Sequence, residues 1–230
     1  YALGVDTFFE RGYDRVFVTA SKGTDSRLFI VNFDSSDVTN TSFISELPLF
    51  SNLARGIEVD NNRTLLAMGN RGFGIVDNFL HTKTYLTNNL VLPGDVDALD
   101  VTQVAGTTAG NETYAVVAGD FDIAGNRLLN SLQPGSGGFF IIENDSANGL
   151  AVTGQLDVAA SSVTVIGHYA YLAAGDGGLV IVDISDHQSP RIISRITGHG
   201  FVHDVDINGN IAYLALGSAG VLTVDFSHPA

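Results

Sequence analysis

Short apolar runs separated by glycine turns recur along the chain. In the clearest copy, an apolar run at residues 170–174 leads through a Gly-rich turn into a second run at 179–182, which ends at Asp183. The arrangement returns at residues 212–225 and 65–77, and two weaker copies with inserts lie at 15–32 and 114–143. Because successive residues of a strand point to opposite faces, runs that are apolar at every position predict strands buried on both faces.

The polar residue that closes the second run marks each repeat. It stands at five positions, with intervals of 45, 66, 40 and 42 residues: Asn32, Asp77, Glu143, Asp183 and Asp225. Further strands are predicted upstream and downstream of the two runs, for example at residues 202–207 and 191–196. Asn208-Gly209 is typical of a two-residue hairpin. The pattern therefore predicts four short antiparallel strands per repeat, and only residues 123–132 fit a short helix.

A four-stranded sheet that returns five times predicts an all-β fold, a β-propeller with about five antiparallel blades around an axis. We expect a single domain over residues 1–230, with repeats at about 1–53, 54–94, 95–158, 159–200 and 201–230. The chain opens with a first strand and ends just after the third strand of repeat five, so the last blade lacks its outer strand. Such an edge exposes unpaired N–H and C=O groups. We expect a protein partner, or further chain of a longer protein of which this is a segment, to complete that blade.

Residues 167–226 resemble the LVIVD-repeat β-propellers, a family named after a strand that stands here as Leu179-Val-Ile-Val-Asp183. The Gly177-Gly178 pair before this strand and the Ser189-Pro190 pair after it also fit, whereas the three earlier repeats match only in the second run. The resemblance implies propeller blades, commonly in secreted or cell-surface proteins. It implies no shared enzymatic activity, so no catalytic residues are carried over.

Composition narrows the classes of function. Hydrophobic residues make up 45% of the chain and charged residues 16%, which is typical of a packed globule. The 11 Lys and Arg residues against 25 Asp and Glu give a net charge of −14, which repels phosphate backbones and anionic lipids, so no nucleic-acid partner is expected. No apolar stretch approaches the roughly 20 residues of a spanning helix, and we expect no direct membrane insertion. The absence of cysteine excludes disulfides and thiolate chemistry.

The loops between strands two and three, and those between blades, are expected on one rim. There the sequence places six candidate binding residues: Arg55, Asp97, His199, His203, Asp120 and Asp122. On an extended chain His199 and His203 lie about 13 Å apart, too far to share one metal ion. Asp120 and Asp122 resemble the start of a calcium loop, but Ala124 and Ser131 stand where an oxygen ligand and a bidentate Glu belong. The alternative is that these loops are polar because they are solvated.

The first strands share a polar position, occupied in the five repeats by Asp6, Glu58, Asp100, Thr164 and Asp206. Equivalent residues of innermost strands are expected near the axis, so the four carboxylates are candidate metal ligands. The alternative is that each carboxylate accepts hydrogen bonds from neighbouring backbone N–H groups.

Together these patterns predict a non-enzymatic, extracellular or cell-surface β-propeller that acts as a structural or protein-interaction module. The alternative is a hydrolase-like or metal-dependent enzyme with its site at the mouth of the axis, using Asp97, His203 and nearby carboxylates. A bound ion or convergent side chains at that mouth would favour the alternative. No cofactor is predicted, with Ca²⁺ left open at the acidic positions named above.

Overall fold

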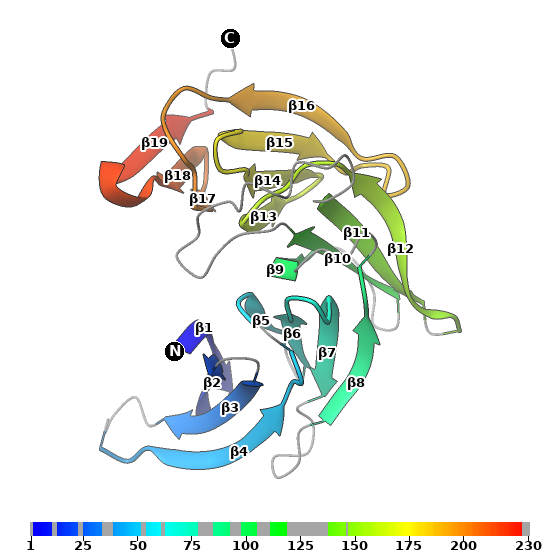
Figure 1. The fold of residues 1–230 in the computed structure, drawn as a ribbon, viewed down its shortest axis with the longest axis vertical. Helices are drawn as coiled ribbons and strands as arrows, with labels where there is room; N and C mark the ends of the chain where they lie inside the picture. Colours follow the sequence, from blue (N-terminus) through cyan, green and yellow to red (C-terminus); the bar gives the residue numbers. More distant parts are fainter. Residues whose placement is uncertain are drawn as a thin grey trace. The chain divides into compact units, whose positions relative to one another are not determined.

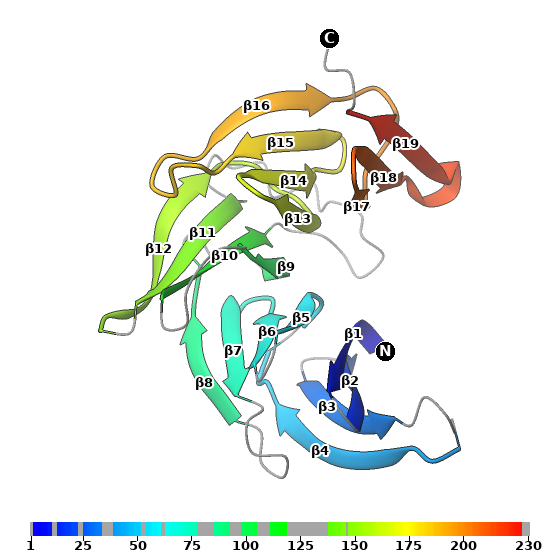
Figure 2. The same ribbon diagram turned by 180° about the vertical axis from the view of Figure 1, so that it is seen from behind.

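The computed structural model describes residues 2–10, 13–22, 25–33, 39–51, 54–60, 63–77, 85–92, 98–104, 111–118, 138–145 and 147–226. This part of the chain is built of strands, with one 3-10 helix, η1 (Gly217–Ala219). The strands form five antiparallel sheets, four with four strands and one with three (Figure 1 and Figure 2). The chain divides into two compact units, Tyr1–Val101 and Thr102–Ala230.

Two sheets in the first unit each follow chain order, and all their neighbouring strands are antiparallel. The first sheet consists of β1 (Ala2–Glu10), β2 (Tyr13–Lys22), β3 (Asp25–Phe33) and β4 (Ser42–Pro48). The second consists of β5 (Ile57–Asp60), β6 (Arg63–Ala67), β7 (Phe73–Asp77) and β8 (Tyr85–Leu90).

Three sheets follow, and the first strand of the first one, β9, crosses the boundary between the units. The third sheet consists of β9 (Ala98–Gln103), β10 (Asn111–Ala118), β11 (Gly138–Asp145) and β12 (Gly149–Leu156). The fourth consists of β13 (Ser162–Ile166), β14 (Tyr169–Ala173), β15 (Leu179–Asp183) and β16 (Arg191–Ile196). The fifth consists of β17 (Asp204–Asn208), β18 (Ile211–Ala215) and β19 (Val221–Asp225).

Consecutive sheets within a unit bury their apolar side chains against each other. In the first unit one cluster joins the first sheet to the second and includes Phe17, Leu28, Ile30, Leu66 and Val76. In the second unit a cluster joins the third sheet to the fourth and includes Val117, Ile141, Leu172, Val180 and Val182. Another joins the fourth sheet to the fifth and includes Ala173, Leu179, Val205, Ala212 and Leu214. The fourth sheet is thus covered on both faces, as its continuous apolar runs predict.

Neighbouring residues of β15 test this expectation directly. Val182 is fully buried in the cluster with the third sheet, as predicted. Ile181 points to the opposite face and packs against the fifth sheet, but it is only half-buried. The prediction that both side chains are buried is therefore wrong for Ile181, because the sheet that covers it has only three strands in the described part of the chain.

The strand ends agree with the sequence pattern in three of the five sheets. Strands β7, β15 and β19 end at Asp77, Asp183 and Asp225. Strand β3 continues one residue past Asn32, and β11 continues two residues past Glu143. One sheet lies within each repeat range expected from the sequence. The segment 123–132, where a short helix was expected, lies outside the described residues.

Candidate functional site

The polar position of the first strands occupies an equivalent place in the observed sheets. The register of the first strand pair shows this through the pairs Asp6–Phe17, Glu58–Leu65, Thr164–Tyr171 and Asp206–Tyr213. The alignment that the sequence predicted for these four residues is therefore correct.

Two of these side chains hydrogen-bond to the first strand of the following sheet. The Asp6 carboxylate accepts a hydrogen bond from the N–H of Thr7 at 2.7 Å and, through its other oxygen, from the N–H of Val59 in β5 at 2.6 Å. The Thr164 hydroxyl donates to the carbonyl of Val205 in β17 at 3.0 Å. Charged acceptors strengthen such bonds. At these two positions the polar side chain therefore fastens one sheet to the next.

The candidate metal ligands do not assemble within the described structure. Asp100 and Asp206 each accept a hydrogen bond from the N–H of the next residue, at 3.0 and 2.8 Å. Among the residues that the structure describes, no group of three or more His, Asp or Glu side chains lies close enough to hold a metal ion. A cation at Asp6, Glu58, Asp100 and Asp206 stays a prediction. Asp120 and Asp122, the candidate calcium loop, lie outside the described residues, as does Asp97.

His203 lies where the fourth and fifth sheets meet. Its ring packs on Phe201, with ring centroids 4.6 Å apart and an interplanar angle of 44°. Its backbone carbonyl accepts a hydrogen bond from the Ser161 hydroxyl at 2.6 Å. A Cβ built on Gly217 would stand 2.9 Å from Nε2, so the ring also covers the β18–β19 turn. These contacts are those of a packing residue, and the hydrolase-like alternative gains no support from them.

The structure also describes two of the other rim candidates, His199 and Arg55. His199 is exposed and follows β16, and Arg55 is half-buried just before β5. The Arg55 N–H donates to the carbonyl of Ala67 at 3.1 Å, which fixes the backbone that enters the second sheet.

The outer edge of β19 is the feature that distinguishes the fifth sheet. In the other four sheets the third strand pairs with a fourth, β4, β8, β12 or β16. In the fifth sheet β19 is the last strand in the described part of the chain (Figure 1). Its pairing with β18 has no bulge. A straight edge strand offers a row of N–H and C=O groups to another strand. We take this edge as the candidate functional site.

Equivalent residues show which backbone groups of β19 face outward. The Thr87 hydroxyl of β8 donates to the carbonyl of Ile75 at 2.9 Å, so this carbonyl faces the fourth strand. The position of Ile75 in the sheet corresponds to Thr223 of β19. Since the N–H and C=O of one residue point to the same side in an antiparallel ladder, both groups of Thr223 face the open edge.

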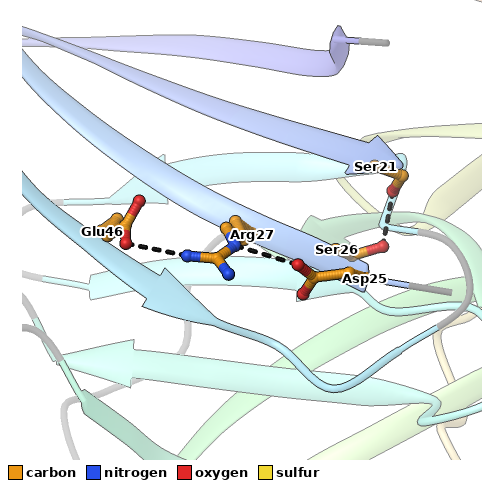
Figure 3. A network of polar contacts seen from close by, with 5 residues as sticks. All are labelled: Ser21, Asp25, Ser26, Arg27 and Glu46. Atoms are coloured by element: carbon orange, nitrogen blue, oxygen red, sulfur yellow. Dashed lines mark hydrogen bonds and ion pairs between the residues drawn. The ribbon is translucent and has the colours of Figure 1, made fainter. Parts of the chain in front are cut away.

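Side chains hold the fourth strand in the first sheet, in a network that sequence reasoning did not find (Figure 3). The Arg27 guanidinium of β3 donates to Glu46 of β4 at 2.8 Å and to Asp25 at 3.1 Å. The hydrogen bond and charge of Asp25, followed by the charge of Glu46, raise the pKa of Arg27. Beside them, the hydroxyls of Ser21 and Ser26 hydrogen-bond across the β2–β3 pair.

In the fourth sheet an ion pair holds the fourth strand, β16. Arg191 of β16 donates to the Asp183 carboxylate at 2.7 and 3.1 Å. Hydrogen bonds from Ser185, together with those from Arg191, hold the pKa of Asp183 well below its usual range. Fourth strands are therefore held by polar side chains as well as by the backbone ladder.

Comparison with known proteins identifies the two C-terminal sheets. Residues 159–197 and 199–230 match the LVIVD repeat, which is associated with β-propeller folds. No curated protein gives a significant match. No helix among the described residues is both long and apolar enough to span a membrane.

Two solved structures share the fold over most of this chain. A functionally unknown protein from Desulfotomaculum acetoxidans DSM 771 matches 91% of the chain with a TM-score of 0.62 and 14% identity, and the chain spans 62% of its length. The computationally designed Ika8 protein matches 97% of the chain with a TM-score of 0.58 and 8% identity, and the chain spans 70% of its length. At such identities the likeness shows the fold alone. The resemblance to the LVIVD repeat is thus confirmed for the fourth and fifth sheets, in a chain with an all-β, β-propeller-like fold.

Proposed function

We propose that this chain is a non-enzymatic β-propeller, located outside the cell or at its surface, which acts as a structural or protein-interaction module. In this proposal the five sheets are five blades, and the outer edge of β19 binds an extended segment of a protein partner. The observation that carries the proposal is that edge, which is straight and lies where four other sheets have a further strand.

The proposal of five blades rests on the repeated packing of sheets. The clusters that join the first sheet to the second, the third to the fourth and the fourth to the fifth use the same alternation of faces. Electron microscopy of the purified protein tests it: we expect a single ring-like particle, and two separately moving bodies would contradict it. The extracellular or surface location rests on the resemblance to the LVIVD repeat, and detection of the protein only inside its cells would contradict it.

Strand addition is the mode of binding that the edge favours. A partner segment gains main-chain hydrogen bonds from such an edge, and pockets for alternate side chains provide specificity. The outer edges of β4, β8, β12 and β16 are less suited because each of these strands is bulged, and bulges disfavour edge pairing. The net charge of −14 disfavours nucleic acid as the partner.

Selection of peptides from a random library against the folded 230-residue protein tests the proposal. Hydrogen exchange would locate each selected peptide, and we expect slowed exchange at residues 221–225. Thr223→Pro removes an outward N–H and should abolish binding, whereas Arg195→Pro, which removes an outward N–H from exposed β16, should not. If no peptide is selected, or if protection falls only outside β19, the proposal is wrong.

A further inference from the structure

The four complete sheets share an irregularity at the same place. Each fourth strand carries one extra residue opposite the third strand, a β-bulge. The bulges lie at Ile30/Val31, Ile75/Val76, Ile141/Ile142 and Ile181/Val182 of the third strands. The register with the second strand assigns Thr223/Val224 of β19 to this position. A strand that completes the fifth sheet in the same way therefore needs a bulge opposite Thr223.

The fourth strands also share a sequence pattern around the bulge. In chain order the six residues are Ser-Phe-Ile-Ser-Glu-Leu (42–47), Tyr-Leu-Thr-Asn-Asn-Leu (85–90), Ala-Val-Thr-Gly-Gln-Leu (151–156) and Arg-Ile-Ile-Ser-Arg-Ile (191–196). After a variable first residue come an apolar residue, a β-branched Ile or Thr as the extra residue, a small Ser, Asn or Gly, a polar residue with an amide or charge, and Leu or Ile. We call these six positions the fourth-strand pattern.

Contacts explain several positions of the fourth-strand pattern. At the extra residue, the hydroxyl of Thr87 donates to the Ile75 carbonyl at 2.9 Å. At the small position, a Cβ on Gly154 would stand 2.0 Å from the carbonyl of His187, so this sheet has no room for a larger residue. At the last position, the aliphatic side chains of Leu47, Leu156 and Ile196 pack against the buried clusters. The pattern thus follows from the contacts that a fourth strand makes with the third strand, with nearby backbone and with the buried clusters.

A glycine beside the edge is matched to the end of the fourth strand. Gly72, Gly178 and Gly220 each close the same turn before the third strand, with φ of 73°, 75° and 88°. A Cβ on Gly72 would meet the Leu90 carbonyl at 2.2 Å, and one on Gly178 would meet the Ile196 carbonyl at 2.0 Å. Around Gly220 no atom of the described residues lies within 4 Å of such a Cβ. The space that the last residue of a fourth strand fills is therefore open at Gly220.

We propose that the β19 edge binds a segment of a separate polypeptide that has the fourth-strand pattern, antiparallel to β19, with its extra residue opposite Thr223 and its final Leu or Ile beside Gly220. This inference rests on the proposed function and names the chemistry of the partner. A separate polypeptide is favoured over a second copy because, among the described residues, the four strands that carry the pattern already pair within their own sheets.

A synthetic peptide spanning residues 189–198 is a direct probe, because it contains the natural fourth strand of the preceding repeat. Fluorescence anisotropy would measure its binding to the 230-residue protein. The control peptide is identical but lacks Ile193, the extra residue. Loss of one residue moves the flanking side chains to the opposite faces, so we expect at least roughly tenfold weaker binding.

The protein-side control is Gly220→Ala. The added methyl group meets no atom of the described residues in the free protein but would overlap the final carbonyl of a docked strand, so we expect binding of the parent peptide to be lost. Circular dichroism and the melting temperature report whether this variant folds. If it does not fold, the two peptides still test the pattern, because both are measured on the unaltered protein.

The outcomes distinguish a failure of this inference from a failure of the proposed function. If the parent and shortened peptides protect β19 equally, the bulged pattern is wrong while strand addition at β19 stands. If neither this peptide nor any library peptide protects β19, the proposed function falls and this inference falls with it. If the free protein forms a concentration-dependent dimer that Gly220→Ala abolishes, a second copy occupies the edge and the assignment to a separate polypeptide is wrong.

Discussion

The fourth and fifth sheets are built from consecutive LVIVD repeats, yet they differ in burial, and the difference is largest on one face. On the face toward the preceding sheet, the equivalent residues Leu172 and Leu214 are 0% and 1% exposed. On the other face, the equivalent residues Leu179 and Val221 are 0% and 68% exposed. The fifth sheet covers Leu179, whereas nothing in the described structure covers Val221.

The difference shows that the repeat sequence specifies the strands of a sheet, whereas the adjacent sheet determines which of their side chains are buried. Both repeats place aliphatic residues on both faces, in the same register. Substitutions at equivalent positions therefore compare two contributions to the free energy of unfolding. One is the contribution of the residue within its own sheet, and the other arises because a further sheet or strand covers it.

The largest difference is expected for truncation of the paired aliphatic residues. Leu179→Ala removes buried methyl groups and leaves a cavity, and should lower the free energy of unfolding by about 2–4 kcal/mol. Val221→Ala, at the exposed equivalent position, should change it by less than about 0.5 kcal/mol. Urea unfolding followed by circular dichroism measures both. Equal effects would mean that the open face of the fifth sheet is covered in solution.

The equivalent turn glycines Gly178 and Gly220 extend the comparison of the two sheets to the outer edge of the third strand. Alanine at either Gly178 or Gly220 adopts a positive φ, which costs on the order of 1–3 kcal/mol. At Gly178 the new Cβ also overlaps the Ile196 carbonyl, so we expect Gly178→Ala to be less stable than Gly220→Ala by at least about 1 kcal/mol. The same unfolding experiment measures this. A larger loss for Gly220→Ala would show that a strand already occupies the β19 edge.

How far the sequence alone predicts the structure depends on whether the signal is local. Continuous apolar runs and Gly turns predicted the paired strands, and Arg191–Ile196 was predicted with its observed bounds. The burial of Ile181 was not predictable from β15, because it depends on how many strands the covering sheet has. The pattern of one strand indicates which of its positions favour burial. It does not indicate how many strands the neighbouring sheet has.

At the candidate site, too, features with a local sequence signal could be predicted and others could not. The open edge was predictable from the count of strands in the last repeat, whereas the shared bulge was not recognised in the sequence. Its residues, such as Thr87 and Ile193, look like ordinary strand formers, and only the register shows that each is an extra residue. The contact of the His203 ring with Phe201 could not be read from residue spacing either, and a binding role for His203 stays a prediction.

A smaller difference is expected at the polar position of the first strands. Thr164→Val keeps the shape of the side chain but removes the hydrogen bond to the Val205 carbonyl, which should cost about 1 kcal/mol. At the equivalent position Asp206 is exposed and bonds only locally among the contacts observed, so Asp206→Asn should change stability by less than about 0.5 kcal/mol. Thermal unfolding of the two variants would test this. A stronger effect of Asp206→Asn would indicate that its carboxylate fastens a further strand, as that of Asp6 does.

The smallest effect is expected at the ion pair that joins β15 to β16, for which the fifth sheet has no described fourth strand. Because the folded pKa of Asp183 lies below the unfolded value of about 3.9, the stabilisation is complete above that value and is lost as the pH falls toward the folded pKa. Asp183→Asn should therefore lower the melting temperature modestly at pH 7, and the deficit should shrink below about pH 4. Arg191→Gln should show a smaller deficit with the same trend, since Ser185 contributes most to the shift. Melting curves at pH 7, 4 and 2.5 measure both variants, and a deficit that stays constant with pH would show that the carboxylate charge does not fasten the fourth strand.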